Sequence, residues 1–162
     1  MESTRTTESA IGRFADVARR YCAWAEGELT DSQEAIRRTR LLLAQLHLAA
    51  VQLPALGIGK DTEATSISQD EWTRLYHKFG SLPVTNYSDV FNPLKEETPV
   101  MNSLADDLAD IYRDLKAGLS LFETNHPIDA AWEWRFGFQT HWGHHLVGAQ
   151  RAIHEYLAEE GL

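Results

Sequence analysis

Four histidines lie in one segment, residues 136 to 156, which reads FGFQTHWGHHLVGAQRAIHEY and otherwise has the apolar pattern of a buried helix. On a helical wheel, His141 and His145 share a strip with Trp134 and Phe138. Residues four positions apart on a helix are neighbours, and this spacing lets two imidazoles bind one metal ion. The pair is therefore a candidate metal site, or else a pair of core histidines that are hydrogen-bonded to partners.

Three aspartates repeat at spacings of three and four residues in the sequence that follows Ser103. Asp107, Asp110 and Asp114 form one ridge on the helix expected there. Like charges at this spacing cost about 0.2–0.5 kcal/mol per pair, so a cation or cationic side chains from a neighbouring helix should offset them. Arg113 is on the same helix but on another face of the wheel. Two interpretations stay open: an ion-paired surface, or a ridge that binds a metal ion.

The short turn ETNHPID joins the helix that carries the aspartates to the helix that carries the histidines. Helices joined by a short turn pack side by side, so aspartate and histidine are expected to meet. A divalent ion bound between them would lower the pKa of a bound water or bridge a phosphate, with Glu133 as the candidate base. The residues between His141 and His145 are WGH, so the glutamate of an HExxH motif is absent.

Apolar residues at helical spacing predict four long helices and one short one. Asp31 with Glu34, Ser68 with Glu71, and Ser103 with Asp106 supply N-terminal capping signals. The expected helices cover residues 7–27, 31–53, 68–79, 103–122 and 127–160. No segment alternates convincingly as a strand does. The predicted fold is an all-α, up-and-down four-helix bundle in a single domain, 1–162, with a long loop and the short helix inserted between helices two and three.

The aromatic residues of the last helix point to more than one side of it. Trp132 lies nearly opposite Trp134 on the wheel, and Trp142 lies between them. A helix that is apolar on several sides is covered by its own domain or by a partner. Tyr87 and Phe91 in the long loop predict that this loop drapes over the core. The candidate interface residues are Trp132, Trp142, Tyr87 and Phe91, for a protein partner or a homodimer, unless the loop itself covers this face.

Composition excludes several classes of protein. The chain has 162 residues, of which 43% are hydrophobic and 24% charged, and its net charge of −9 would repel nucleic acid and anionic membranes. The richest apolar run, residues 41–59, is interrupted by Gln45, His47 and Pro54, and the N-terminus lacks an apolar signal core. Cys22 is the single cysteine and is expected to be a small buried hydrophobe. We expect a cytoplasmic protein.

Several phrases of the sequence resemble a bacterial family known as domain of unknown function 5063. They are YSDVFNP (87–93), SLADDLADIYRDLKAGL (103–119), DAAWEWRFGFQTHWGHHLVGAQRAIH (129–154) and FADVARRYCAWAE (14–26). The resemblance covers nearly the whole chain. It implies an all-helical bundle, in agreement with the helical periodicity, and it supplies no activity, cofactor or catalytic residue.

Two functions follow from these residues. The first is a non-enzymatic module that binds another protein or assembles with itself and needs no cofactor, because no P-loop, nucleophile elbow, Rossmann glycine pattern or CxxC is present. The second is a helical bundle that binds a divalent metal and has hydrolase-like activity, with the aspartates of the third long helix and the histidines of the last as ligands. Whether the protein is an enzyme stays open between them.

Overall fold

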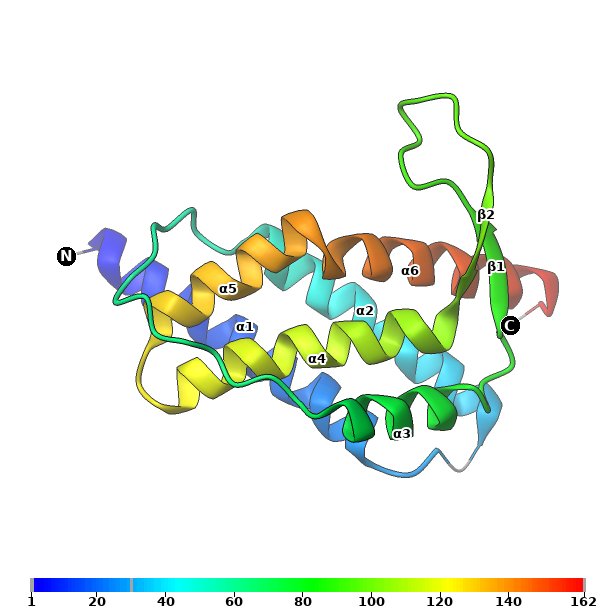
Figure 1. Ribbon diagram of the computed structural model, residues 1–162, viewed down its shortest axis with the longest axis horizontal. Helices are drawn as coiled ribbons and strands as arrows, with labels where there is room; N and C mark the ends of the chain where they lie inside the picture. Colours follow the sequence, from blue (N-terminus) through cyan, green and yellow to red (C-terminus); the bar gives the residue numbers. More distant parts are fainter. Residues whose placement is uncertain (1, 30, 162) are drawn as a thin grey trace.

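The computed structural model describes residues 2–29 and 31–161 and is mostly helical (Figure 1). Its helices are α1 (Glu2–Glu26), α2 (Ser32–Val51), α3 (Gln69–Phe79), α4 (Leu104–Glu123), α5 (Pro127–Thr140) and α6 (Trp142–Glu159). Two short strands, β1 (Asn86–Asp89) and β2 (Val100–Ser103), lie between α3 and α4. The all-α prediction is thus right for most of the chain.

The predicted helix starts follow from capping groups. The side chain of Asp31 accepts hydrogen bonds from the backbone N–H groups of Gln33 and Glu34, at 2.8 and 2.9 Å. Ser68 caps α3 and Ser103 caps α4 in the same way, each through the N–H three residues on. Each cap satisfies backbone donors that have no partner inside the helix. These starts are therefore confirmed to within one residue.

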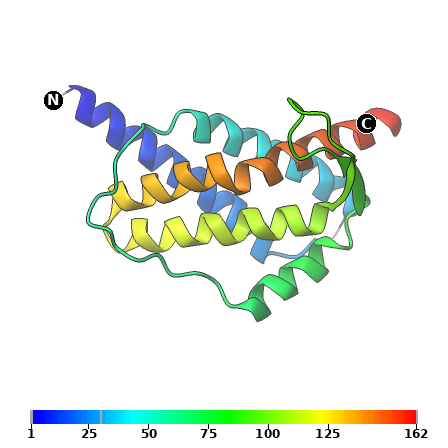
Figure 2. The same ribbon diagram turned by 45° about the horizontal axis from the view of Figure 1, so that its top comes forward.

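Helix α4 lies at the centre of the helical packing. It contacts α1, α3, α5 and α6, and both views show the α5–α6 pair alongside it (Figures 1 and 2). The hydroxyl of buried Tyr21 on α1 donates to the carbonyl of Leu108 at 2.8 Å. Trp134 and Trp142 are both fully buried and both contact the ring of Phe14. A central helix has few faces open to solvent, so Asp107 and Asp110 on α4 are buried and need partners.

The expectation that residues 55–102 contain no strand is wrong. β1 and β2 pair antiparallel with Asn86 opposite Ser103, and the backbone N–H of Leu104 donates to the carbonyl of Thr85. Strands of four residues are too short for an alternating pattern to stand out. The hairpin stands at one end of the helices, and the segment that joins its strands extends beyond α6 (Figure 1).

The prediction of one continuous last helix over 127–160 is also wrong. His141 has φ −144° and ψ −86°, which separates α5 from α6. At this break the carbonyl of Phe138 approaches Gly143 so closely that a Cβ on Gly143 would lie 2.0 Å from its oxygen. The apolar pattern runs through the break without a gap, so periodicity alone did not indicate it. The four-helix description therefore misses both the hairpin and this break.

Cys22 is buried, as predicted, with 4% of its surface exposed. Across the part of the chain that the structure describes, none of the helices combines the length and apolar character needed to span a membrane.

Candidate metal centre

The aspartate ridge of α4 faces the two histidines at the α5–α6 break. His141 occupies the break itself, and His145 lies in the first turn of α6. Their rings are neighbours, with centroids 4.9 Å apart and planes inclined by 72°. The meeting of aspartate and histidine that the sequence suggested is therefore present in the structure.

Each histidine makes a short contact with a different aspartate through Nδ1. His141 Nδ1 lies 2.7 Å from Asp114 Oδ2, and His145 Nδ1 lies 2.8 Å from Asp107 Oδ1. An ionised carboxylate can only accept a hydrogen bond, so each Nδ1 carries the proton and donates it. In a neutral imidazole this fixes the tautomer and leaves Nε2 with a lone pair.

Both lone pairs face the same carboxylate oxygen. Nε2 of His145 lies 3.3 Å from Asp110 Oδ2, and Nε2 of His141 lies 3.7 Å from it. The three side chains can each offer a ligand atom within 4.8 Å of the others. Bonds of about 2.0–2.2 Å at tetrahedral or octahedral angles separate ligand atoms by about 2.8–3.6 Å. Small side-chain movements would therefore bring all three onto one ion.

The other oxygen of Asp110 is fully engaged by neutral and cationic donors. Trp72 Nε1–H donates to Asp110 Oδ1 at 2.7 Å, and Arg113 Nη2 lies 2.9 Å from the same oxygen. Asp110 itself is 8% exposed. These contacts fix the carboxylate so that Oδ2 is the oxygen turned toward the histidines. On the helical wheel Arg113 lies on another face of the helix, but its long side chain extends back to Asp110 on the aspartate ridge.

Asp107 is held from the hairpin. The hydroxyl of Tyr87 on β1 donates to Asp107 Oδ2 at 2.7 Å, while Asp107 Oδ1 accepts from His145. This arrangement depends on Gly148, because a Cβ there would lie 2.4 Å from the Tyr87 hydroxyl oxygen. Metal-ligating histidines commonly donate their second N–H to a carboxylate in this way, which fixes the ring.

A second set of ligand atoms shares His145. Asp106, Asp107 and His145 also offer ligand atoms within 4.8 Å of one another. For His145 to serve both sets, it would have to lose the Nδ1 proton that it donates to Asp107. The set formed by Asp110, His141 and His145 leaves every Nδ1–H···carboxylate bond in place. The set of Asp110, His141 and His145 is therefore the better candidate for a metal site, because a metal ion could bind there without breaking these hydrogen bonds.

Charge around His145 favours a cation. Burial by itself would lower the pKa of His145, but the hydrogen bond to Asp107 and the charges of Asp107, Asp110 and Asp106 outweigh it and raise the pKa above its ordinary value. Burial, followed by the charge of Asp110, raises the pKa of Asp106. The carboxylates thus favour positive charge at the imidazole of His145, whether a proton or a metal ion supplies it.

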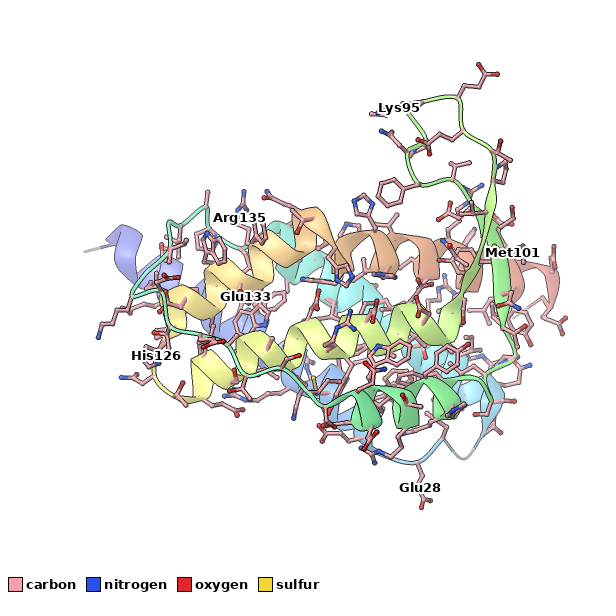
Figure 3. The ribbon with its side chains drawn as sticks, viewed as in Figure 1. Glu28, Lys95, Met101, His126, Glu133 and Arg135 are labelled. Carbon is pink, nitrogen blue, oxygen red and sulfur yellow. The ribbon has the colours of Figure 1, made fainter. Side chains whose placement is uncertain are left out.

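A cleft of about 1070 Å³ opens beside the two histidines. His141 and His145 line it together with Asp107, and the hairpin and its connecting segment form the opposite wall. In Figure 3, Met101 lies on that hairpin and Lys95 at the far end of the connection. Histidine side chains that are 41% and 22% exposed can be reached from this cleft.

The remaining predicted site residues are placed differently. Glu133 projects from α5 on the side of α4 (Figure 3), and burial, with the nearby charge of Asp114, raises its pKa. Among the described residues it belongs to neither set of convergent ligand atoms. Trp142 lies in the core and not on a face open to a partner, since it is fully buried and donates from Nε1 to the carbonyl of Trp134.

The other candidate interface residues lie nearer the surface. Trp132 is partly exposed and stacks on Phe136. Tyr87 is bound to Asp107 and so belongs to the site, while Phe91 is 73% exposed and stacks on His144 beside the cleft. The hairpin and its connection therefore face the histidines of α6 across the cleft, with a contact between Phe91 and His144, and leave Trp132 outside this contact.

Sequence reasoning missed the roles of Trp72, Tyr87 and Arg113 at the site. Trp72 lies on the predicted short helix α3 and Tyr87 on β1, and the sequence does not predict how either element packs against α4. Their side chains carry a polar group on an aromatic ring, which usually finds a partner when buried. This preference for a hydrogen-bond partner was the only indication in the sequence that Trp72 and Tyr87 belong to the site. It does not identify which residue the partner is.

The comparisons with known proteins agree with this fold. A crystal structure of protein BF1032 from Bacteroides fragilis is similar to this chain, with a TM-score of 0.75 and 22% sequence identity over 91% of each chain. At that identity the similarity concerns the fold alone. No curated protein matches the sequence. The sequence profile of domain of unknown function 5063 (DUF5063) matches residues 5–159, and the chain belongs to that family.

Proposed function

We propose that this protein binds one divalent transition-metal ion through Asp110 Oδ2, His141 Nε2 and His145 Nε2. The observation that carries the proposal is the convergence of two imidazole Nε2 atoms on one carboxylate oxygen, at 3.3 and 3.7 Å, while both Nδ1 atoms are engaged elsewhere. When both imidazoles are neutral, their two Nε2 lone pairs and the carboxylate oxygen repel one another unless a cation lies between them. A metal ion meets that need with all three groups as ligands.

The donor set favours a borderline ion over a hard one. Imidazole suits zinc, iron, copper and nickel, whereas magnesium and calcium favour oxygen ligands. Two histidines and one carboxylate leave coordination positions free for water or for a ligand. An ion with an open position would act as a Lewis acid or lower the pKa of a bound water, which is the basis of a hydrolase-like activity.

Metal content and thermal stability test the proposal. The protein is purified without a histidine tag, and its melting temperature is recorded with EDTA and with Zn²⁺, Mn²⁺, Fe²⁺ or Mg²⁺. A ligand at a hundredfold over its Kd adds about 2.7 kcal/mol, which raises the midpoint by about 5–10 °C in a chain of this size. We expect such a rise with Zn²⁺ or Fe²⁺ and a smaller one with Mn²⁺ or Mg²⁺.

Three variants make the test specific. Asp110→Asn and His145→Ala should abolish the metal-dependent rise, because each removes a ligand. His154→Ala is the matched control, since His154 is exposed on the same helix, remote from the two ligand sets. An equal metal response in wild type and in both ligand variants would mean that the ion binds elsewhere, and the absence of any response would mean that a proton fills this role.

A protein-interaction role remains a second candidate because of one surface feature. Leu94 and Met101, on the hairpin and its connection, are 93% and 70% exposed. Exposed apolar side chains of this kind occur at protein interfaces. Sedimentation of wild type and Leu94→Asp tests this role: a dimer that the variant dissociates would support self-assembly, and a monomer in both would count against it.

A further inference from the structure

The cleft beside the histidines is much larger than a metal ion with its water ligands needs. Its volume of about 1070 Å³ lies just above the usual range for small-molecule sites, which runs to about 1,000 Å³. Phe91 and Met101 line the wall formed by the hairpin, and Phe138 and Val147 line the wall formed by the helices. A cleft of this size beside reactive groups is suited to an organic ligand.

The walls of the cleft expose large apolar side chains to solvent, which is unfavourable. Phe91 is 73% exposed, Met101 70% and Val147 51%. The ring of Phe91 stacks on His144 with a centroid distance of 5.2 Å and an interplanar angle of 19°. Since this pair contributes an aromatic surface at the cleft, an apolar or aromatic body placed there would bury these side chains.

The charges of the cleft disfavour anions. Asp89, Asp106 and Asp107 line it, and Arg151 is its single lysine or arginine within the described part of the chain. Arg151 in turn lies 3.9 Å from Asp89. A divalent ion bound beside Asp106, Asp107 and Asp110 would be neutralised by them, so no excess positive charge would remain for a phosphate or a carboxylate.

We propose that the cleft binds an uncharged small molecule with an aromatic body and an oxygen or nitrogen group that coordinates the metal. This inference rests on the proposed metal site. The coordinating group would fill an open position of the ion, and the ring would pack against Phe91 and Val147. The carboxylates of the cleft would repel an anionic ligand. The apolar side chains of its walls would favour a ligand with an aromatic ring.

Calorimetry of the zinc-loaded protein with three probes tests the ligand class. Benzohydroxamic acid is an aromatic chelator that is uncharged in solution at neutral pH and releases its N-hydroxyl proton to solvent when it coordinates a metal ion. Acetohydroxamic acid has the same chelating group without the ring, and phenyl phosphate has the ring with a group that is already anionic in solution. We expect benzohydroxamic acid to bind roughly tenfold more tightly than acetohydroxamic acid and more tightly than phenyl phosphate. Phe91→Ala should weaken benzohydroxamic acid by roughly three- to tenfold and leave acetohydroxamic acid unchanged.

Phe136→Ala is the control, because Phe136 is an exposed aromatic that stacks on Trp132 away from the cleft. It should change neither hydroxamate. Zinc binding is measured separately by titration of the metal-free protein. If zinc binds but the two hydroxamates bind alike, or phenyl phosphate binds most tightly, the ligand class is wrong and the metal site stands. If zinc does not bind, both proposals fall.

Discussion

Asp107 of α4 and His145 of α6 are joined by a hydrogen bond of 2.8 Å between Oδ1 and Nδ1, and Asp107 is 3% exposed. The bond sets the orientation of the imidazole and turns Nε2 toward Asp110. It also links the site to the hairpin, because Tyr87 holds the second oxygen of Asp107. In the proposed metal site, Asp107 would therefore act through His145 and would not be a ligand itself.

Asp107→Asn should weaken zinc binding without abolishing it. Loss of the carboxylate that holds a ligating histidine typically costs about 10–100-fold in metal affinity. Competition with a chromophoric chelator measures the affinity. Asp106→Asn is the matched control, because it changes the adjacent carboxylate, which is a ligand only in the second set. If Asp106→Asn weakens zinc binding more than Asp110→Asn does, the ion is bound by Asp106, Asp107 and His145 instead.

Trp72→Phe should destabilise the metal-free protein by about 1–2 kcal/mol. The variant retains an aromatic ring to stack on Tyr76 but removes the N–H that donates to Asp110 Oδ1 at 2.7 Å, and a hydrogen bond to a charged group is worth more than a neutral one. Urea unfolding gives the free energy. Trp24→Phe, which keeps a ring against Phe79, controls for the smaller side chain. Equal losses in the two variants would mean that the hydrogen bond contributes little.

The aspartates and the histidines of the site could both be predicted from the sequence. The contacts that Trp72 and Tyr87 make with the aspartates could not. Asp107, Asp110 and Asp114 repeat at helical spacing, and so do His141 and His145, so each set could be assigned to one helix face. The short turn between their helices predicted that the faces meet. Trp72 reaches Asp110 from α3, whose helical character the sequence predicts but whose packing against α4 it does not. Tyr87 reaches Asp107 from a segment without periodicity, and no local rule predicts where such a chain crosses the core.

The break at His141 was hidden for a different reason. Apolar residues continue at helical spacing from α5 into α6, and no proline marks the boundary, so the sequence pattern is that of one helix. Gly143 was visible, but a glycine inside a helix has several explanations, among them close packing of another helix. Position 143 requires glycine because the carbonyl of Phe138 lies so close to it. That contact exists only in the folded chain and cannot be predicted from the sequence.

Gly143→Ala should destabilise the protein and reduce zinc affinity together. A Cβ at this position would lie 2.0 Å from the Phe138 carbonyl oxygen, so the break that holds His141 must shift, and such overpacking costs about 1–3 kcal/mol. Gly12→Ala is the matched control in an open position of α1, where alanine should stabilise by about 0.5–1 kcal/mol. Thermal unfolding and zinc titration of both variants measure the two effects. A neutral Gly143→Ala would mean that the break tolerates a side chain.

A second network, remote from the histidines, sets part of the acid stability. Tyr112 donates its hydroxyl to Glu26 Oε1 at 2.8 Å, and Lys116 Nζ lies 3.1 Å from the same oxygen. Burial alone would raise the pKa of Glu26, but Tyr112 and Lys116 outweigh it and hold the pKa below its ordinary value of 4.5. A carboxyl group with a lowered pKa stabilises the fold above the unfolded value and loses that contribution as the pH falls through the folded value.

Glu26→Gln should therefore reduce the free energy of unfolding at neutral pH by an amount that shrinks as the pH falls below about 4.5. Glutamine can still accept from Tyr112, but it forms no ion pair with Lys116. Urea unfolding at a series of pH values gives the difference between wild type and variant. Glu28→Gln, at an exposed position just beyond α1, is the control for the loss of one negative charge (Figure 3). A difference that stays constant from neutral to acid pH would show that the ionised form of Glu26 does not contribute to stability, because the pH dependence comes only from its charge.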